Sequence, residues 1–358
     1  MINKEYFKRA EELAEYKGIS IEDVHEAAKR GLIQSFKKVY GNNCCRVDIN
    51  PEKNEILLFA VYKVVEELST EPQENQTAKE ILLEDAKLIK KSAKIGDIIE
   101  QKVDFRNFSR TAVSAAKNTT NQSIKQTERD NAYEYFKSLE NEMVVGEVIN
   151  IGPKVVTLKL GYNVTTILPL AEFSNVADLG IGDSVRVYVK KVEQTTKEPK
   201  VYVSRTDRAL VTRLMENYIP EIKEGIIEIK GIARDPGDRS KIALYSNDPK
   251  IDAIGSCVGE GGLRIRQIVD ALGGEKVDLY KWSENPEELI ANSLQPAAVT
   301  KVLSVDVKEK SSVVIVPDDH LSLAIGKMGQ NVRLAVQSCG WKIDIMPVSE
   351  AYDKGLLI

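Results

Sequence analysis

The segment Val258-Gly-Glu-Gly-Gly-Leu-Arg-Ile-Arg266 has a counterpart further along the chain, Ile325-Gly-Lys-Met-Gly-Gln-Asn-Val-Arg333. In both, two residues separate a pair of glycines, and an arginine stands four positions after the second glycine. The counterpart begins 67 residues later, and a downstream Gly-x-Lys-x-Asp pattern at 274–278 recurs 66 residues later at 340–344. Because self-similarity at a fixed interval indicates a repeated structural unit, this part of the chain is predicted to contain one fold twice.

Similar periodic patterns flank the two motifs. Each copy shows a helical pattern, two strand patterns, a short helix before the glycines, a second helix after them and a final strand. The leading helices are expected at 210–218 and 286–293, and the paired strands at 226–234 with 241–245 and at 300–307 with 313–316. The order α-β-β-α-α-β, present twice, predicts two tandem type II KH domains.

The Gly-x-x-Gly loops are the candidate RNA-binding sites. Two glycines let a sugar-phosphate backbone approach closely, and the next helix presents free N–H groups and its positive dipole end to phosphates. An adjacent apolar groove in such a domain holds about four unstacked bases. The candidate RNA-binding residues are Gly259, Glu260, Gly261, Gly262, Arg264 and Arg266 in the first copy, and Gly326, Lys327, Met328, Gly329, Gln330, Asn331 and Arg333 in the second.

The two loops differ in charge. Lys327 is placed to attract phosphate, whereas Glu260 repels it, so we expect the second loop to contact RNA more strongly. An alternative stays open for the two arginines of the motif: Arg266 and Arg333 are equally typical of helix-surface residues that form intramolecular ion pairs. A single Gly-x-x-Gly is most often an ordinary loop, whereas two copies, each between helices and flanked by the same strands, are a much stronger indication of a nucleic-acid site.

A segment of short strands precedes the repeat. Strand patterns lie at 144–149, 155–160, 163–169, 184–191 and 200–204, with glycine- and proline-containing turns between them. Five short strands in about 65 residues favour a small closed barrel of the OB type, with another five-stranded barrel as the alternative. Aromatic residues that could stack on bases in this barrel are Tyr162, Phe173 and Tyr188, although Phe173 could equally fill the barrel interior.

The first 140 residues show an α+β pattern. Helices are expected at 5–16, from Ser20 to about residue 39, at 77–91 and at 109–139. Strands are expected at 45–49, 56–65 and 98–105. The long polar helix at 109–139 is interpreted as the boundary element that leaves this domain.

Composition excludes several classes of function. The chain has 358 residues, 42% of them hydrophobic, and a net charge of −4, which is not the balance of a protein that coats duplex DNA. It has two histidines and four cysteines without a Cys-x-x-Cys pair, and it lacks a Gly-x-x-x-x-Gly-Lys-Ser/Thr phosphate loop. Asp318 in Asp-Asp-His is expected to cap the following helix rather than to bind a metal. We therefore expect no catalytic residues, metal or cofactor, and a cytoplasmic protein without a membrane segment.

Three longer segments are distinctive: Arg-Asp-Pro-Gly-Asp-Arg-Ser-Lys-Ile-Ala at 234–243, Val-Pro-Asp-Asp-His-Leu-Ser-Leu-Ala-Ile-Gly-Lys at 316–327 and Gly-Gln-Asn-Val-Arg-Leu-Ala at 329–335. Through these segments the chain resembles the bacterial NusA family of transcription elongation and termination factors. The resemblance is most specific over 200–346 and looser over 1–140. The first loop, with Glu260 and Gly261, and the second, with Met328, depart from the residues common in the family.

The resemblance implies a domain organisation and a set of partners. The implied segments are an RNA-polymerase-binding domain at 1–130 with a connecting helix to about 140, an S1-like OB domain at 141–206, KH domains at 207–283 and 284–348, and a short tail at 349–358. The implied partners are the bacterial RNA polymerase core, nascent single-stranded RNA and other Nus-type elongation and antitermination factors. We expect a monomer that modulates pausing, intrinsic termination and antitermination without catalysis.

Two other functions are compatible with KH and S1 modules. Some RNA-degrading enzymes carry both, but in the order KH then S1 after catalytic domains, the reverse of the order here. An accessory RNA-binding protein of RNA processing or of the ribosome is the remaining alternative.

Overall fold

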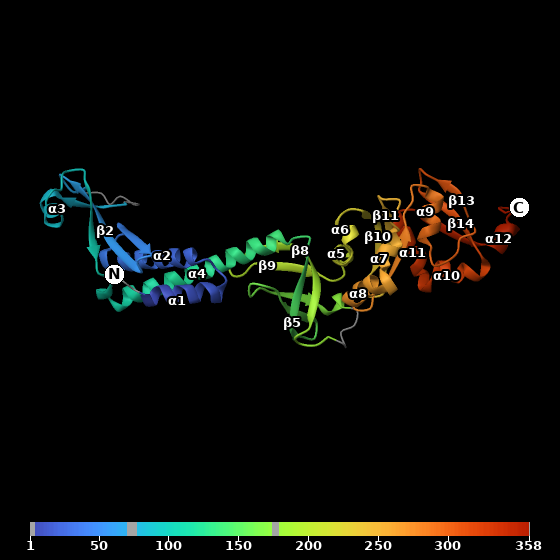
Figure 1. Cartoon of the computed structure of the whole chain (residues 1–358), viewed down its shortest axis with the longest axis horizontal. Helices are drawn as coiled ribbons and strands as arrows, with labels where there is room; N and C mark the ends of the chain where they lie inside the picture. Colours follow the sequence, from blue (N-terminus) through green and yellow to red (C-terminus); the bar gives the residue numbers. More distant parts are fainter. Residues whose placement is uncertain (1–3, 70–76, 174–178, 358) are drawn as a thin grey trace. The chain divides into compact units, whose positions relative to one another are not determined.

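A computed structural model describes residues 4–69, 77–173 and 179–357 of the chain (Figure 1). The chain forms two compact units, Met1–Tyr135 and Phe136–Ile358. No helix among the described residues is both long enough and apolar enough to cross a lipid bilayer.

The first unit combines helices with a four-stranded sheet. Its helices are α1 (Lys4–Lys17), α2 (Ile21–Tyr40), α3 (Leu83–Ile89) and α4 (Arg110–Ser138), the last of which runs into the second unit, and its strands are β1 (Cys45–Asn50), β2 (Glu55–Val65), β3 (Lys79–Leu82) and β4 (Ile98–Val103). The long strand β2 pairs with all three others, antiparallel to β1 and β4 and parallel to β3. The α+β prediction for this region is confirmed.

Local sequence signals place the helices of the first unit. The Ser20 hydroxyl accepts a hydrogen bond from the Asp23 N–H at 3.1 Å, which caps the start of α2. Helices α2 and α4 approach so closely that a Cβ on Gly31 would lie 2.2 Å from Thr120 Oγ1 and 2.8 Å from the carbonyl oxygen of Ala116. Glycine is therefore required at position 31 to bring α2 against α4.

The predicted helix at 77–91 is wrong in its first part. Residues Lys79–Leu82 form β3, which pairs with β2 from Tyr62 to Val65, and α3 starts only at Leu83. Ile81 packs into a small core with Val64, so the pairing and the burial outweigh the local helical pattern.

The second unit begins with a five-stranded sheet. Its strands are β5 (Met143–Ile151), β6 (Val155–Lys159), β7 (Thr165–Pro169), β8 (Ser184–Glu193) and β9 (Lys200–Ser204). The order is β7-β6-β5-β8-β9, and the Thr166 hydroxyl donates to the carbonyl of Val201 at 2.6 Å, which joins the two end strands. The sheet is thus a nearly closed barrel, as predicted, around side chains that include the fully buried Leu158, Leu168 and Val187.

Two modules with the same arrangement of strands follow the barrel, and the first has one additional short helix, α6. The first contains α5 (Arg208–Tyr218), α6 (Pro220–Lys223), β10 (Ile227–Asp235), β11 (Arg239–Ser246), α7 (Ala253–Val258), α8 (Leu263–Ala271) and β12 (Lys276–Lys281). The second contains α9 (Pro286–Ser293), β13 (Lys301–Asp306), β14 (Ser311–Val316), α10 (Leu321–Ile325), α11 (Gln330–Cys339) and β15 (Lys342–Pro347). In each, the first two strands are antiparallel and the last strand lies parallel to the second, which confirms two type II KH folds.

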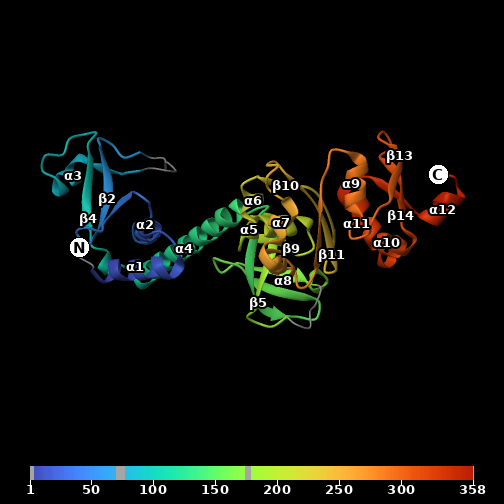
Figure 2. The same cartoon turned by 45° about the vertical axis from the view of Figure 1, so that its right-hand side comes forward.

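The core of the second KH module extends into the first module, whose strand β11 lies beside α11 of the second (Figure 2). Ala243 and Tyr280 of the first module pack with Leu289 and Ile290 of α9. Helix α11 lies directly on β10, where a Cβ on Gly231 would stand 2.0 Å from the carbonyl oxygen of Ser338. The sheet of the first module is therefore covered on one face by its own helices and on the other by helices of the second module.

The chain beyond β15 forms a further helix, α12 (Val348–Asp353), in which Ala351 is fully buried. The prediction that Asp318 caps the helix after it is wrong. The N-terminal cap position of α10 is His320, without a side-chain bond, and Asp318 instead accepts hydrogen bonds from the hydroxyl and the backbone N–H of Ser349. A bond to a residue 31 positions away cannot be read from a local pattern.

Candidate RNA-binding site

The two Gly-x-x-Gly loops have the same backbone. Gly259 has φ 73° and ψ 174°, and Gly326 has φ 77° and ψ 171°, a region of the backbone map that is open essentially only to glycine. A Cβ on Gly326 would also lie 2.7 Å from the backbone nitrogen of Asn331. The repeat seen in the sequence is therefore a repeat of loop geometry, held by a close approach of the loop to the next helix.

The second loop is open to solvent. The side chain of Met328 is 96% exposed, and that of Lys327 is exposed with no carboxylate within 4 Å among the residues that the structure describes. Apolar side chains flank the loop on its N-terminal side, where Leu323 and Ile325 of α10 are also exposed. An unpaired ammonium group, a helix N-terminus and exposed apolar side chains are the combination that a phosphate and unstacked bases require.

Sequence reasoning did not single out Leu323 and Ile325. Which apolar side chains of α10 are exposed depends on how the helix packs: Ala324 is buried and Leu321 packs against the core, whereas Leu323 and Ile325 face solvent, and no local pattern indicates this division.

In each module, the residue two positions after the second glycine of the loop holds the loop in place. In the first module, Arg264 Nη1 donates to both carboxylate oxygens of Glu221 at 2.9 Å and to the carbonyl of Ser256 at 2.8 Å. The hydrogen bonds to Arg264 keep the pKa of Glu221 below its usual range. Arg264, a predicted RNA-binding residue, is thus occupied in fastening the loop to α6 and α7.

Asn331 has the same place in the second module. It is 7% exposed, and its Nδ2 donates to the carbonyls of Leu294 and Ala324 at 3.0 Å each. Its Oδ1 is buried and accepts no hydrogen bond from any described residue. This side chain ties the loop to the end of α9, and its role as an RNA contact stays a prediction.

The arginines that end the two motifs behave differently. Arg266 donates to the carbonyls of Gly261 and Gly262 and so lies over its own loop. Arg333 instead pairs with Asp235 of the first module, with 2.7 Å between Nη2 and Oδ2. The alternative of an intramolecular ion pair is therefore confirmed for Arg333, whereas Arg266 stays beside the loop that it was predicted to serve. The side-chain amide of Gln330 also donates a hydrogen bond to Asp235. In the first loop, the side chain of Glu260 is exposed to solvent.

The barrel aromatics lie mostly at the junction with the first KH module. The Tyr188 hydroxyl donates to Asn141 Oδ1 at 2.9 Å, and its ring packs against the core of that module. The Phe173 ring faces the Arg205 guanidinium at 5.4 Å and is not part of the buried barrel interior. Of the three, Tyr162, at 50% exposure, lies on an open part of the barrel surface.

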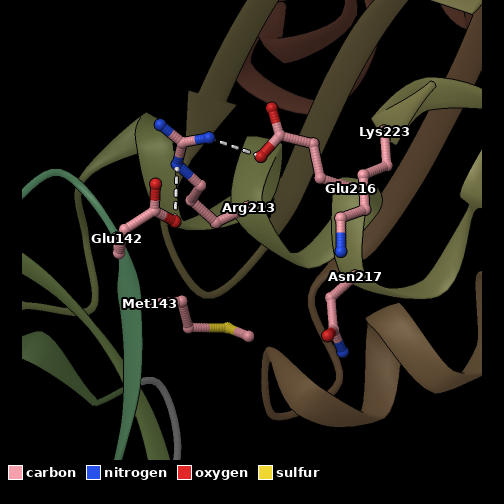
Figure 3. Close-up of a pocket in the computed structure, with 6 residues that line it drawn as sticks. All are labelled: Glu142, Met143, Arg213, Glu216, Asn217 and Lys223. Atoms are coloured by element: carbon pink, nitrogen blue, oxygen red, sulfur yellow. Dashed lines mark hydrogen bonds and ion pairs between the residues drawn. The ribbon is translucent and has the colours of Figure 1, made fainter. Parts of the chain in front are cut away.

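A cavity of about 350 Å³ lies at this junction (Figure 3). Arg213 of α5 crosses it, donating from Nε to the Asn141 carbonyl at 2.8 Å and from Nη1 to Glu216 at 2.6 Å, with Glu142 3.5 Å away. Its other lining residues are Met143, Asn217 and Lys223. Arg213 and its partners thus connect the barrel to the KH module, since Asn141 and Glu142 directly precede β5 whereas Arg213 and Glu216 lie in α5.

Comparison with known proteins agrees with this architecture. Sequence models match in the order NusA N-terminal domain at 5–130, S1 RNA binding domain at 138–204, NusA-like first KH domain at 205–282 and NusA-like second KH domain at 286–353. The transcription termination/antitermination protein NusA of Halalkalibacterium halodurans is 40% identical over 357 residues, which cover 99% of this chain and 91% of that protein.

This chain belongs to the NusA family. The NusA proteins of Bacillus subtilis and Thermus thermophilus are 40% and 35% identical to it, over 96% of this chain in both cases and over 91% and 89% of their own lengths. The resemblance noted from residues 234–243, 316–327 and 329–335 is thereby confirmed, and these segments lie in the two KH modules of this NusA family member.

Proposed function

We propose that this chain is a transcription factor that binds RNA polymerase through residues 1–130 and nascent single-stranded RNA through the second unit. Its effects would be on pausing, intrinsic termination and antitermination, in line with the names of its relatives as termination/antitermination proteins. The observation that carries the RNA-binding part is the open second loop. Its Lys327, which has no ion-pair partner among the described residues, lies beside the N-terminus of α11 and next to exposed apolar side chains.

The mechanism is differential binding rather than catalysis. A factor that binds a paused or hairpin-containing complex more tightly than an elongating one shifts the population toward the paused state by the difference in binding free energy. Attachment of one unit to the polymerase makes the encounter of the other with RNA effectively intramolecular, so a weak RNA site suffices. The packing of Ala243 and Tyr280 of the first KH module into the core of the second supports a single rigid track for the RNA.

The RNA contacts that we propose differ between the loops. In the second loop they are the backbone around Gly326 and Gly329 with the side chains of Lys327 and Met328. In the first loop they are the backbone of Gly259, Gly261 and Gly262 with Arg266, against the repulsion of Glu260. The barrel contributes through Tyr162, the aromatic side chain on its open surface.

Single-round transcription tests this function. The template carries a hairpin pause and an intrinsic terminator, and reactions with a bacterial polymerase compare no protein, the full chain and a fragment that starts at Phe136, the first residue of the second unit. We expect longer pauses with the full chain and loss of the effect with the fragment. No change with the full chain, despite measurable RNA binding, would move the function toward RNA processing or the ribosome.

A further inference from the structure

Arg333 and Arg266 hold equivalent positions in the two repeats but point to different partners. Arg266 lies at its own loop, with its guanidinium nitrogens within 4.0 Å of where a Cβ on Gly261 or Gly262 would stand. At Gly329, the glycine and its chain neighbours aside, no side chain of the described residues lies within 4 Å of the corresponding position. The second loop therefore has its arginine drawn away from the place that the first loop's arginine occupies.

The partner that draws it away is the turn between β10 and β11 of the first module. Asp235 Oδ2 accepts from Arg333 at 2.7 Å and from Gln330 Nε2 at 2.8 Å, and Asp238 Oδ2 accepts from the same Gln330 amide at 2.7 Å. Both residues that reach the turn belong to the first turn of α11, directly after the second loop.

This turn is rigid, and the other cations close to it are already paired. Its backbone is fixed because the Gly237 N–H donates to the buried Glu275 at 2.9 Å and the Asp238 carbonyl accepts from Lys276 N–H at 2.9 Å. The nearby cations have other partners, since Arg234 pairs with Glu275 and Arg239 pairs with Asp278. Within the described parts of the chain, Arg333 is the only cation paired with Asp235.

We propose that Asp235 and Asp238 form an acidic gate on a backbone-phosphate site of the second loop. This site consists of Lys327, Arg333 and the N-terminus of α11. In the RNA-free protein Asp235 retains Arg333, and an RNA phosphate displaces the carboxylate and takes the guanidinium, which then lies over the loop as Arg266 does in the first module. The inference rests on the proposed function, since it concerns RNA binding at this loop.

Physical chemistry makes the exchange feasible. The Arg333 and Asp235 side chains are 55% and 36% exposed, and an ion pair at such a surface is weak and screened by salt. A phosphate offers the guanidinium bidentate hydrogen bonds, and beside Lys327 and a helix N-terminus it has two further favourable interactions. The gate therefore favours an anion that fits the loop over other anions. Release of Arg333 also removes one ion pair between the two KH modules.

The test is a set of variants of the full chain, titrated with a single-stranded RNA oligonucleotide across several salt concentrations. Asp235→Asn keeps the shape and removes the charge. We expect it to raise RNA affinity by about two- to fivefold, because no ion pair has to be broken when a phosphate takes Arg333. The dependence of log affinity on log salt should steepen by up to about 0.7, because no displaced Asp235 carboxylate is left to take up a counterion. Glu224→Gln removes the same charge from an exposed residue that follows α6 of the first module, and it should change neither quantity by as much.

A double-mutant cycle separates the gate from simple charge repulsion. If the gain in affinity comes from release of Arg333, Asp235→Asn should have little effect on RNA affinity in an Arg333→Gln background. If it comes only from lost repulsion between Asp235 and RNA, the increase in affinity should persist in that background, which would overturn the proposal. A loss of affinity in Asp235→Asn would also overturn it, because Asp235 would then position Arg333 for RNA. Failure of the unaltered chain to bind RNA would instead refute the proposed function.

Discussion

Glu275 and Arg234 form a buried ion pair in the first KH module, with 2.9 Å between Oε2 and Nη2. The Glu275 side chain is fully buried and that of Arg234 is 5% exposed. The carboxylate also accepts from the Ser240 hydroxyl at 2.6 Å, and the guanidinium donates to the Asp207 carbonyl at the start of α5 at 2.6 Å. The pair thus connects β10, β11 and β12 to the segment that links the barrel to the module.

Removal of one member of this pair leaves a buried charge without its partner. We expect Glu275→Gln to lower the free energy of unfolding of the second unit by about 3 kcal/mol, because the Arg234 guanidinium stays buried. Urea unfolding followed by tryptophan fluorescence measures this, since both tryptophans of the chain, Trp282 and Trp341, lie in the second unit. The exposed Glu224→Gln serves as control, and an equal effect of both substitutions would contradict a special role of the pair.

The buried Lys241 predicts a pH dependence of stability. Its side chain is fully buried and donates from Nζ to the Gln295 carbonyl of the second module at 2.7 Å, and burial lowers the pKa of Lys241 to about 8 from 10.5. Between these pH values the unfolded chain binds more protons than the folded one. Stability of the second unit should therefore rise from about pH 8 to pH 10.5, by at most about 3 kcal/mol from this group.

Unfolding of the second unit in urea at about pH 7.5, 9 and 10.5 checks the direction. Lys241→Met should flatten the rise, because it removes the titrating group, whereas Lys276→Met on the neighbouring strand, where the side chain is exposed, should leave it unchanged. A rise of the same size in Lys241→Met would assign the pH dependence to other groups.

The repeat was the part of the fold that the sequence could predict best. The same pattern occurs twice, so each copy supports the interpretation of the other. Gly259 and Gly326 adopt a backbone conformation that only glycine tolerates, and a glycine at such a position can be recognised in the sequence. Strand β3 was missed because it is stabilised by pairing with β2, and the local sequence pattern does not show this pairing. The pairing of Arg333 with Asp235 joins residues 98 positions apart, and the sequence only left it open as one of two roles for the arginine.

Gly31 predicts a steric effect in the first unit. Gly31→Ala places a Cβ against Thr120 Oγ1 and the Ala116 carbonyl, so we expect α2 and α4 to separate at a cost of about 1–3 kcal/mol. Thr120→Ala added to Gly31→Ala should recover only part of this loss, because the clash with the backbone carbonyl stays. Thermal unfolding by circular dichroism measures the change, and tryptophan fluorescence should not follow it, since the first unit contains no tryptophan.

The second loop predicts a loss of RNA affinity on charge reversal. Lys327→Asp together with Met328→Asp places two carboxylates where the RNA backbone would pass, so affinity for single-stranded RNA at fixed salt should fall at least several-fold. Lys308→Asp with Val307→Asp introduces the same charges at an exposed turn between β13 and β14 of the same module and serves as a matched control. Both variants should retain the circular dichroism spectrum of the unaltered chain, since all four side chains are exposed. Equal affinity of the loop variant and the unaltered chain would remove the second loop from the RNA-binding surface, and an equal loss in both variants would reduce its role to general electrostatics.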